Sequence, residues 1–160
     1  MTCAYLNQSI ERYQAIVLQF ENLFERFDLQ IEEQAHIARY LCVLGCGLLE
    51  EGIKGILTDF CTRKTGGAPE VMSFCESRLR RFQTPKIRNI SDLLKSFSLS
   101  WAEAFDNAIE DRVRDHVNAV VAQRHLIAHG RHCSISFGTM ITYSKSIRSL
   151  LNSVEEIVGI

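Results

Sequence analysis

The sequence contains few residues that break helices. Its 160 residues include two prolines, Pro69 and Pro85, and nine glycines. Proline interrupts the hydrogen bonds of a helix interior and glycine weakens them, so a chain with so few of them can form long helices. Hydrophobic residues make up 46% of the chain, which is ordinary for a folded protein and argues against disorder. We expect one domain, spanning residues 1–160.

The sequence also lacks a strong charge of either sign and a long apolar run. Its formal net charge is −1, so nucleic-acid binding would need a local basic patch. The longest apolar run, residues 41–49, is far shorter than the ~20 residues that cross a membrane. No secretory signal is visible after Met1. The expected location is therefore the cytoplasm, with no membrane partner.

The cysteines do not form a Cys-x2-Cys pair. They are Cys3, Cys42, Cys46, Cys61, Cys75 and Cys133. Several lie on predicted apolar faces, which favours buried, reduced thiols over disulfides or a metal site.

Apolar residues recur at spacings of three and four, which predicts amphipathic helices. The first is expected over residues 9–27, with Ser9 as its N-cap. The second covers about 31–60 and contains four glycines, which permit a close crossing with a neighbour or mark a kink between Gly45 and Gly47. A third is expected to start at Pro69 and end before Pro85.

Three further helices are predicted in the second half of the chain. Ser91 is expected to cap a short one. Ser100 and Glu103 have capping-box spacing, and the helix that they open is expected to run to Gly130. Residues 131–141 are expected to be extended or a loop, and the last helix to begin near Thr142 or Ser144. These patterns predict an all-α bundle.

Residues 124–130 read Arg-His-Leu-Ile-Ala-His-Gly, at the predicted end of a long helix. The guanidinium of Arg124 is a permanent planar cation that fits phosphate. The side chains of His125 and His129 exchange protons near neutral pH, since an ordinary histidine has a pKa of about 6.5. Together these groups could hold a phosphodiester and transfer protons around it, which indicates metal-free RNA cleavage.

A purely structural interpretation of this segment stays open. Arg124 follows Val120 and Val121 on the apolar face, so it could pair with Glu50 or Glu51, or bind the carbonyl groups at the helix end. The two histidines would then only favour the negative end of the helix dipole.

The segment resembles the Arg-x4-His signature of the HEPN superfamily. Residues 79–86 (Leu-Arg-Arg-Phe-Gln-Thr-Pro-Lys), 90–95 (Ile-Ser-Asp-Leu-Leu-Lys) and 97–101 are similar to the RiboL-PSP type of HEPN domain. The resemblance implies a HEPN-like antiparallel bundle of about four long helices plus one or two short helices. It also implies a dimer that is a metal-independent endoribonuclease, often a toxin of a toxin–antitoxin pair or a phage-defence effector.

By position, the resemblance makes Arg124 and His129 the catalytic pair and His125 an auxiliary polar residue. Members that are partnered by a nucleotidyltransferase often carry tyrosine two residues after the motif histidine. Here that residue is Arg131, which argues against control by adenylylation.

Cleavage through the RNA 2′-hydroxyl requires a base, an acid and a cation near the phosphoryl oxygens. One helix end supplies few such groups, whereas a two-fold interface supplies two arginines and at least two histidines. We therefore expect a homodimer with a composite active site, an RNA substrate and no cofactor. An antitoxin protein is a further possible partner.

A basic block is the candidate surface for RNA phosphates. It comprises Arg78, Arg80, Arg81, Lys86 and Arg88, with no acidic residue between Ser77 and Ser91, and Arg131 is a further candidate. The alternative is an ordinary solvated face.

Two other interpretations are weaker or of a different class. His125, His129, His132 and Cys133 contain a His-x3-His pair that could bind zinc, but there is no motif carboxylate and no cysteine pair, so no metal is expected. The alternative function is a catalytically inactive helical module that dimerises or binds RNA or a partner protein.

Overall fold

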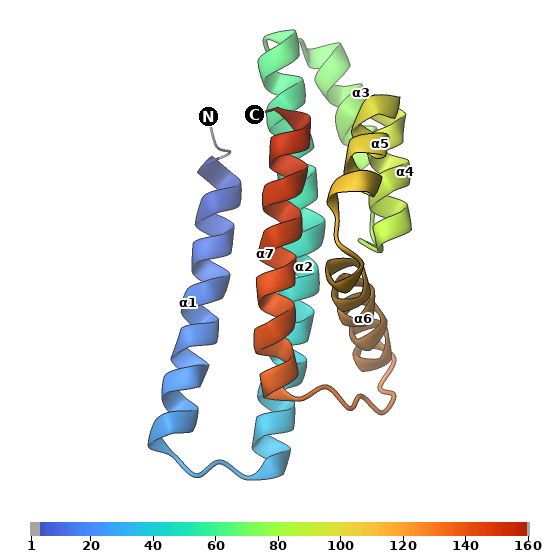
Figure 1. Cartoon of the computed structure of the whole chain (residues 1–160). Helices are drawn as coiled ribbons and strands as arrows, with labels where there is room; N and C mark the ends of the chain where they lie inside the picture. The colour runs from blue at the N-terminus through green and yellow to red at the C-terminus, as the bar shows by residue number, and fades with distance from the viewer. Residues whose placement is uncertain (1–3, 160) are drawn as a thin grey trace.

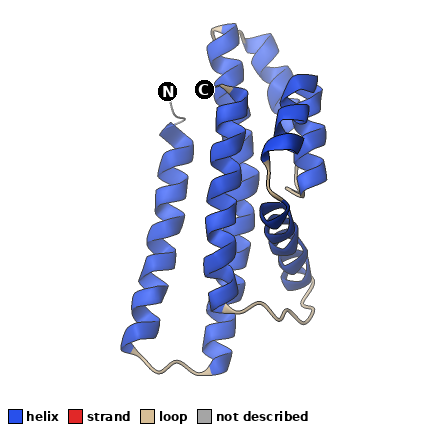
Figure 2. Ribbon diagram, in the orientation of Figure 1, coloured by secondary structure: helices blue, strands red, loops and turns tan. Residues whose placement is uncertain are grey.

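A computed structural model describes residues 4–159 of the chain. These residues form helices and no strand (Figures 1 and 2). The helices are α1 (Ala4–Arg26), α2 (Ile31–Thr65), α3 (Pro69–Leu79), α4 (Ile87–Phe97), α5 (Leu99–Ala108), α6 (Asp111–Ala128) and α7 (Phe137–Val158). The predicted all-α bundle is confirmed, with four long helices and three short ones.

Helices α2 and α7 lie side by side at the centre of the bundle (Figure 1). Helix α1 packs on α2 at one edge, and α6 packs on both central helices at the other edge. The short helices α3, α4 and α5 lie beyond the start of α6, near the C-terminal end of α2 (Figure 1). The core is continuous across these elements and contains side chains with no exposed surface, such as Leu49, Ile53 and Leu150. None of the described helices has a stretch that is long and apolar enough to span a bilayer.

Glycines on α2 allow the two central helices to approach closely. A Cβ atom on Gly45 would lie 2.9 Å from Ile147 Cδ1, and one on Gly52 would lie 2.9 Å from Leu151 Cδ2. Both neighbours belong to α7, and α2 continues through residues 45–47 without a break. The close crossing that the glycines suggested is therefore confirmed, and the kink is not observed.

Helices α1 and α7 begin earlier than their sequence patterns indicated. Helix α1 starts at Ala4 rather than at Ser9, and its first turn buries Leu6. Helix α7 starts at Phe137 rather than at residue 142 or 144, because Ser136 is its N-cap and its Oγ accepts a hydrogen bond from the backbone N–H of Thr139 (3.1 Å). The extra turn of α7 stacks Phe137 on the ring of Phe24, with centroids 4.1 Å apart.

The predicted helix from Ser100 to Gly130 is in fact two helices, α5 and α6. Ile109 is extended (φ −82°, ψ 118°) and separates them. Arg114 stabilises the break because its guanidinium donates to the carbonyl oxygens of Ile109 (3.0 Å) and Asp106, which the end of α5 leaves free. The capping positions also differ, since Ser98 precedes α5 and α4 begins before Ser91.

The five described cysteines are free and buried, as predicted; Cys3 lies outside the described residues. Burial raises the pKa of Cys42 to about 12. The Cys61 thiol lies 2.9 Å from Cys75 Sγ, a contact between α2 and α3 that spacing alone did not indicate.

Substitutions at two α2 glycines should have opposite effects on stability. Gly47 has open space at its Cβ position, so Gly47→Ala should raise the free energy of unfolding by about 1 kcal/mol through helix propensity. Gly45→Ala should lower it by about 1 kcal/mol, because Tyr13 Oη would lie 3.0 Å from the new methyl group and is held by Ser144 at 2.9 Å. Urea unfolding at 25 °C measures both changes, and equal stabilisation by the two alanines would contradict the close crossing.

Candidate functional site

The candidate site is the C-terminal end of α6, which is closed by a Schellman motif. Gly130 has a left-handed backbone (φ 62°), its N–H donates to the carbonyl of Ile127 (3.1 Å), and the N–H of Arg131 donates to the carbonyl of Leu126 (2.9 Å). This pattern satisfies carbonyl groups that a helix end leaves free. The turn therefore holds His129, the C-cap residue, in a defined position next to the last helical turn.

Arg124 lies on the same face of α6 as its buried valines, but its side chain is exposed. It follows Val117 and Val120 around α6, and both valines are fully buried. A long side chain can lay its stem along such a face and keep its guanidinium in water. Burial raises the pKa of Cys46 to about 11, and the positive charge of Arg124 opposes this rise, so the guanidinium lies near this part of α2.

The expected structural partners of Arg124 are engaged elsewhere. Lys54 lies 2.6 Å from Glu50 and 3.1 Å from Glu51, within α2. Among the described residues, Arg124 forms no hydrogen bond or ion pair. Its guanidinium is therefore available to an anion from outside the chain.

The two motif histidines lie together on the surface. The rings of His125 and His129 meet edge to face, with centroids 4.4 Å apart, and both residues are exposed. Four residues make slightly more than one helical turn, which explains the contact. Two neighbouring imidazoles can provide both a proton acceptor and a proton donor to one ligand.

Arg124 and His129 point in different directions from the same helix. Five residues of an α-helix rotate by about 500°, so the two side chains leave α6 about 140° apart. The motif residues of one chain therefore do not converge on one point along the helix. A second copy of the segment could supply the missing direction.

The residues after the motif do not gather into a metal site. Arg131 and His132 are exposed, whereas Cys133 is buried in the core at 4% exposure. Among the described residues, no group of three or more His, Cys, Asp or Glu side chains is placed to hold a metal ion.

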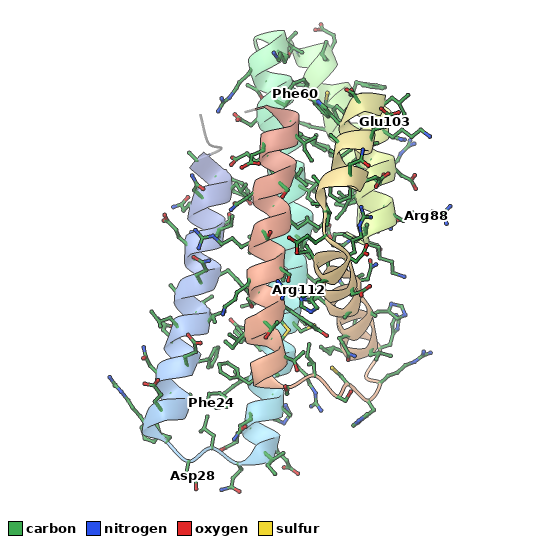
Figure 3. The ribbon with its side chains drawn as sticks, viewed as in Figure 1. Phe24, Asp28, Phe60, Arg88, Glu103 and Arg112 are labelled. Carbon is green, nitrogen blue, oxygen red and sulfur yellow. The ribbon has the colours of Figure 1, made fainter. Side chains whose placement is uncertain are left out.

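The basic block lies on α3, on α4 and on the turn between them, and all five of its residues are exposed. Arg88 projects outward from the first turn of α4 (Figure 3), and its side chain is 92% exposed. Its only acidic neighbour among the described ion pairs is Asp92 at 4.0 Å. The block thus presents cations that the protein itself scarcely neutralises.

Asn118 connects the basic block to the motif helix, a link that sequence reasoning missed. Its Oδ1 accepts a hydrogen bond from the N–H of Ile87 (3.1 Å), at the start of α4. His125 and His129 follow Asn118 by seven and eleven residues, so each leaves α6 within about 20° of the direction of Asn118. The beginning of α4 and both histidines are therefore on one side of α6. The sequence did contain a signal for this shared side, since spacings of seven and eleven residues place Asn118 and the two histidines on one face of a helix.

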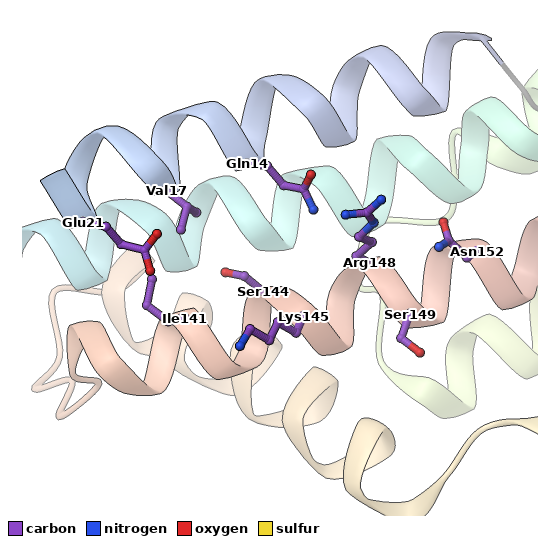
Figure 4. Close-up of a pocket in the computed structure, with 9 residues that line it drawn as sticks. All are labelled: Gln14, Val17, Glu21, Ile141, Ser144, Lys145, Arg148, Ser149 and Asn152. Atoms are coloured by element: carbon purple, nitrogen blue, oxygen red, sulfur yellow. The ribbon is translucent and has the colours of Figure 1, made fainter.

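Two other polar features lie elsewhere on the bundle. His116 donates to or accepts from Ser146 Oγ (2.8 Å) on α7 and stacks near Tyr143, so it joins helices. A hollow of about 540 Å³ lies between α1 and α7 (Figure 4) and includes Lys145 and Arg148. In Figure 1 the α1 edge is opposite the α6 edge, which separates this hollow from the motif.

The sequence profile of the RiboL-PSP-HEPN family matches residues 7–159. The chain therefore belongs to the RiboL-PSP-HEPN family, which confirms the resemblance to the RiboL-PSP type of HEPN domain. Membership points to a role related to RNA, since HEPN domains often bind RNA and dimerise. No curated protein and no solved structure matches the chain.

Gly130→Ala should loosen the end of α6. A left-handed backbone costs a residue with a Cβ roughly 1 kcal/mol more than glycine, so the free energy of unfolding should fall by about that amount. Hydrogen exchange should also become faster at the amides of Gly130 and Arg131, which form the Schellman bonds. Gly138→Ala is the matched control because this glycine has no positive φ and no atom within 4 Å of its Cβ position. Equal protection in both variants would contradict the role assigned to Gly130.

Proposed function

We propose that the protein is a metal-independent endoribonuclease whose active site combines the 124–129 segments of two chains. The observation that carries the proposal is the surface at the end of α6. There Arg124 is exposed and has no hydrogen bond or ion pair within residues 4–159, and two exposed histidine rings lie 4.4 Å apart. Membership of the RiboL-PSP-HEPN family supports the same function.

Each proposed role follows from the chemistry of its side chain. One neutral imidazole removes the proton of the RNA 2′-hydroxyl, and the resulting oxygen attacks the adjacent phosphorus. The same imidazole, now protonated, gives this proton to the departing 5′-oxygen, so the products are a 2′,3′-cyclic phosphate and a 5′-hydroxyl. We assign this acid–base work to His129, and we assign orientation of the phosphate or of His129 to His125.

The guanidinium of Arg124 is proposed to bind the phosphoryl oxygens. Two parallel N–H donors fit two oxygens of one phosphate and stabilise the negative charge that grows during attack. Since Arg124 and His129 leave one α6 helix about 140° apart, the proposal takes the arginine from one chain and the histidine from its partner.

The basic residues outside the motif are proposed to bind more of the RNA backbone. Arg78, Arg80, Arg81, Lys86, Arg88 and Arg131 are all exposed. A site of this kind would suit a toxin of a toxin–antitoxin pair or a phage-defence effector, with an antitoxin protein as its regulator. The competing function is an inactive HEPN module that only dimerises or binds RNA.

Substitution of the motif should abolish cleavage of single-stranded RNA. Arg124→Ala and His129→Ala should each reduce the rate at least 100-fold, because general acid–base catalysis and charge stabilisation commonly contribute that much. His36→Ala is the matched control, since His36 is exposed on α2 outside the motif. Gel analysis of labelled RNA and growth after induction measure the effect. A wild type that is inert in both assays would favour the inactive module.

Mixing the two inactive variants tests the composite site. If each site takes Arg124 from one chain and His129 from the other, heterodimers of Arg124→Ala with His129→Ala retain one intact site. Random re-association should restore about a quarter of the wild-type sites. A double variant that carries both substitutions is the control, and should restore none. Absence of any recovery after mixing, with dimers present in sedimentation analysis, would place the site within one chain.

Chelation should leave the reaction unchanged. The proposed groups are a guanidinium and imidazoles, so cleavage in excess EDTA should proceed at the rate in buffer, and elemental analysis of the purified protein should find no bound metal. Loss of activity in EDTA that zinc restores would instead support the His125, His129, His132 and Cys133 interpretation.

A further inference from the structure

Helix α3 exposes apolar side chains beside basic ones. Phe74 is 74% exposed and Val71 is 42% exposed. Arg78 and Arg81 follow at spacings that place all four residues along one side of the helix and its C-terminal turn. A large aromatic ring in water next to arginines is a combination that binds nucleobases and phosphates.

These residues line a hollow of about 590 Å³ between the end of α2, α3 and α4. Its apolar lining includes Phe60, Val71, Phe74 and Phe97, and its cations are Lys64, Arg78 and Arg81. Among the described residues, those that line it include no carboxylate. The Lys64 ammonium lies 5.8 Å from the centroid of Phe60, so a cation is already held over the aromatic part of the hollow.

A second hollow adjoins the first and shares two of its residues. Arg78 and Arg81 also line this second hollow of about 370 Å³, together with the uncharged polar residues Gln83, Thr84 and Asn89 and one carboxylate, Asp92. The chain then reaches Lys86 and the N–H of Ile87, which is bound to Asn118 on the side of α6 that carries His125 and His129. We call this surface, from Phe74 through Arg81 and Lys86 to His125, the α3–α6 track.

The length of the track follows from contacts along α2. The Cys42 thiol donates to the carbonyl of Val120 (3.4 Å), one turn before Arg124 on α6, and Cys61 lines the first hollow. The nineteen residues from Cys42 to Cys61 rise by about 28 Å. A strand stacked at about 3.4 Å per nucleotide would cover this distance with roughly eight nucleotides.

We propose that the α3–α6 track binds an unpaired RNA strand that leads away from the scissile phosphate, with one base stacked on Phe74. The phosphates of this strand bind Lys64, Arg78, Arg81 and Lys86. The inference rests on the proposed function for the identity of the ligand. It goes beyond that function because it assigns a base-binding position far from the motif and a minimum length to the substrate.

The distribution of charge favours RNA over an acidic peptide in this surface. Cations line both hollows and Lys86 follows them, with polar side chains such as Gln83 and Asn89 between, which matches a polymer with one charge per nucleotide. The exposed apolar side chains, Val71 and Phe74, lie at the α3 end, whereas Phe82 and Leu93 of the second hollow are buried. This exposed stretch is too short for the continuous apolar face of a helix bound in a groove.

RNA binding by Phe74 variants tests the stacking position. All proteins carry His129→Ala so that RNA is not cut, and fluorescence anisotropy compares a labelled unstructured 16-nucleotide RNA of adenosine and cytidine with a tetranucleotide. Phe74→Ala should weaken binding of the 16-nucleotide RNA about fivefold or more, as loss of a stacked base does, and leave the tetranucleotide unchanged. Phe74→Trp should retain the affinity. Phe27→Ala, at another exposed phenylalanine (60%), should have no effect.

Salt dependence tests the phosphate contacts. Arg81→Ala should reduce the slope of log affinity against log salt concentration by about 0.7, the value for one phosphate of a single strand. Arg148→Ala is the matched control, since this exposed arginine lines the separate hollow between α1 and α7. It should leave the slope unchanged.

The outcomes separate this inference from the proposed function. If the wild type cleaves no RNA but Phe74→Ala still loses affinity for the 16-nucleotide RNA, the nuclease proposal fails and the track stands. The track proposal is wrong if Phe74→Ala and Arg81→Ala bind the 16-nucleotide RNA as tightly as their control variants do. It is also wrong if the protein does not bind this RNA. An effect of Phe74→Ala on binding of an acidic peptide or on self-association, with RNA affinity unchanged, also overturns it.

Discussion

The close crossing of α2 and α7 is the constraint on which the rest of the bundle depends. Side chains of Ile147 and Leu151 occupy the space that a Cβ would need at Gly45 and Gly52, so the two helices share their apolar surface at short range. Helix α6 packs on both of them and inserts Val117 and Val120 into the same core. The rotation of α6 is fixed by these buried valines, because turning it would place them in water.

The fixed rotation of α6 decides what the helix presents to solvent. Arg124 leaves over α2 near Cys46, whereas His125 and His129 leave on the side of Asn118, where α4 begins. The buried face of α6 therefore sets the directions in which Arg124, His125 and His129 point. Both proposals follow from this geometry. The direction of Arg124 leads to its proposed pairing with a second chain, and the direction of the two histidines leads to the proposed RNA track.

Proline and glycine predicted helix ends correctly where the packing of the helices agreed with them. The break at residues 65–69, the start of α3 at Pro69 and the glycine after α6 are observed as expected. The predicted continuous helix through Ile109 is wrong, since its apolar spacing is compatible with one helix or with two. The choice between them depends on Arg114, whose guanidinium satisfies the carbonyl groups at the end of α5.

The sequence by itself determined the class of fold, the helical periodicity and the chemistry available at residues 124–130, because these depend on residue types and short spacings. Glu50 and Glu51 precede Lys54 by four and three residues, so the sequence spacing already allowed their ion pairs within α2. Only the tertiary structure decided that Arg124 has no hydrogen bond or ion pair among the described residues. It also decided that Cys61 meets Cys75 and that Asn118 receives the first N–H of α4. These contacts join residues from different helices, and their distances follow from how whole helices pack, which no local spacing encodes.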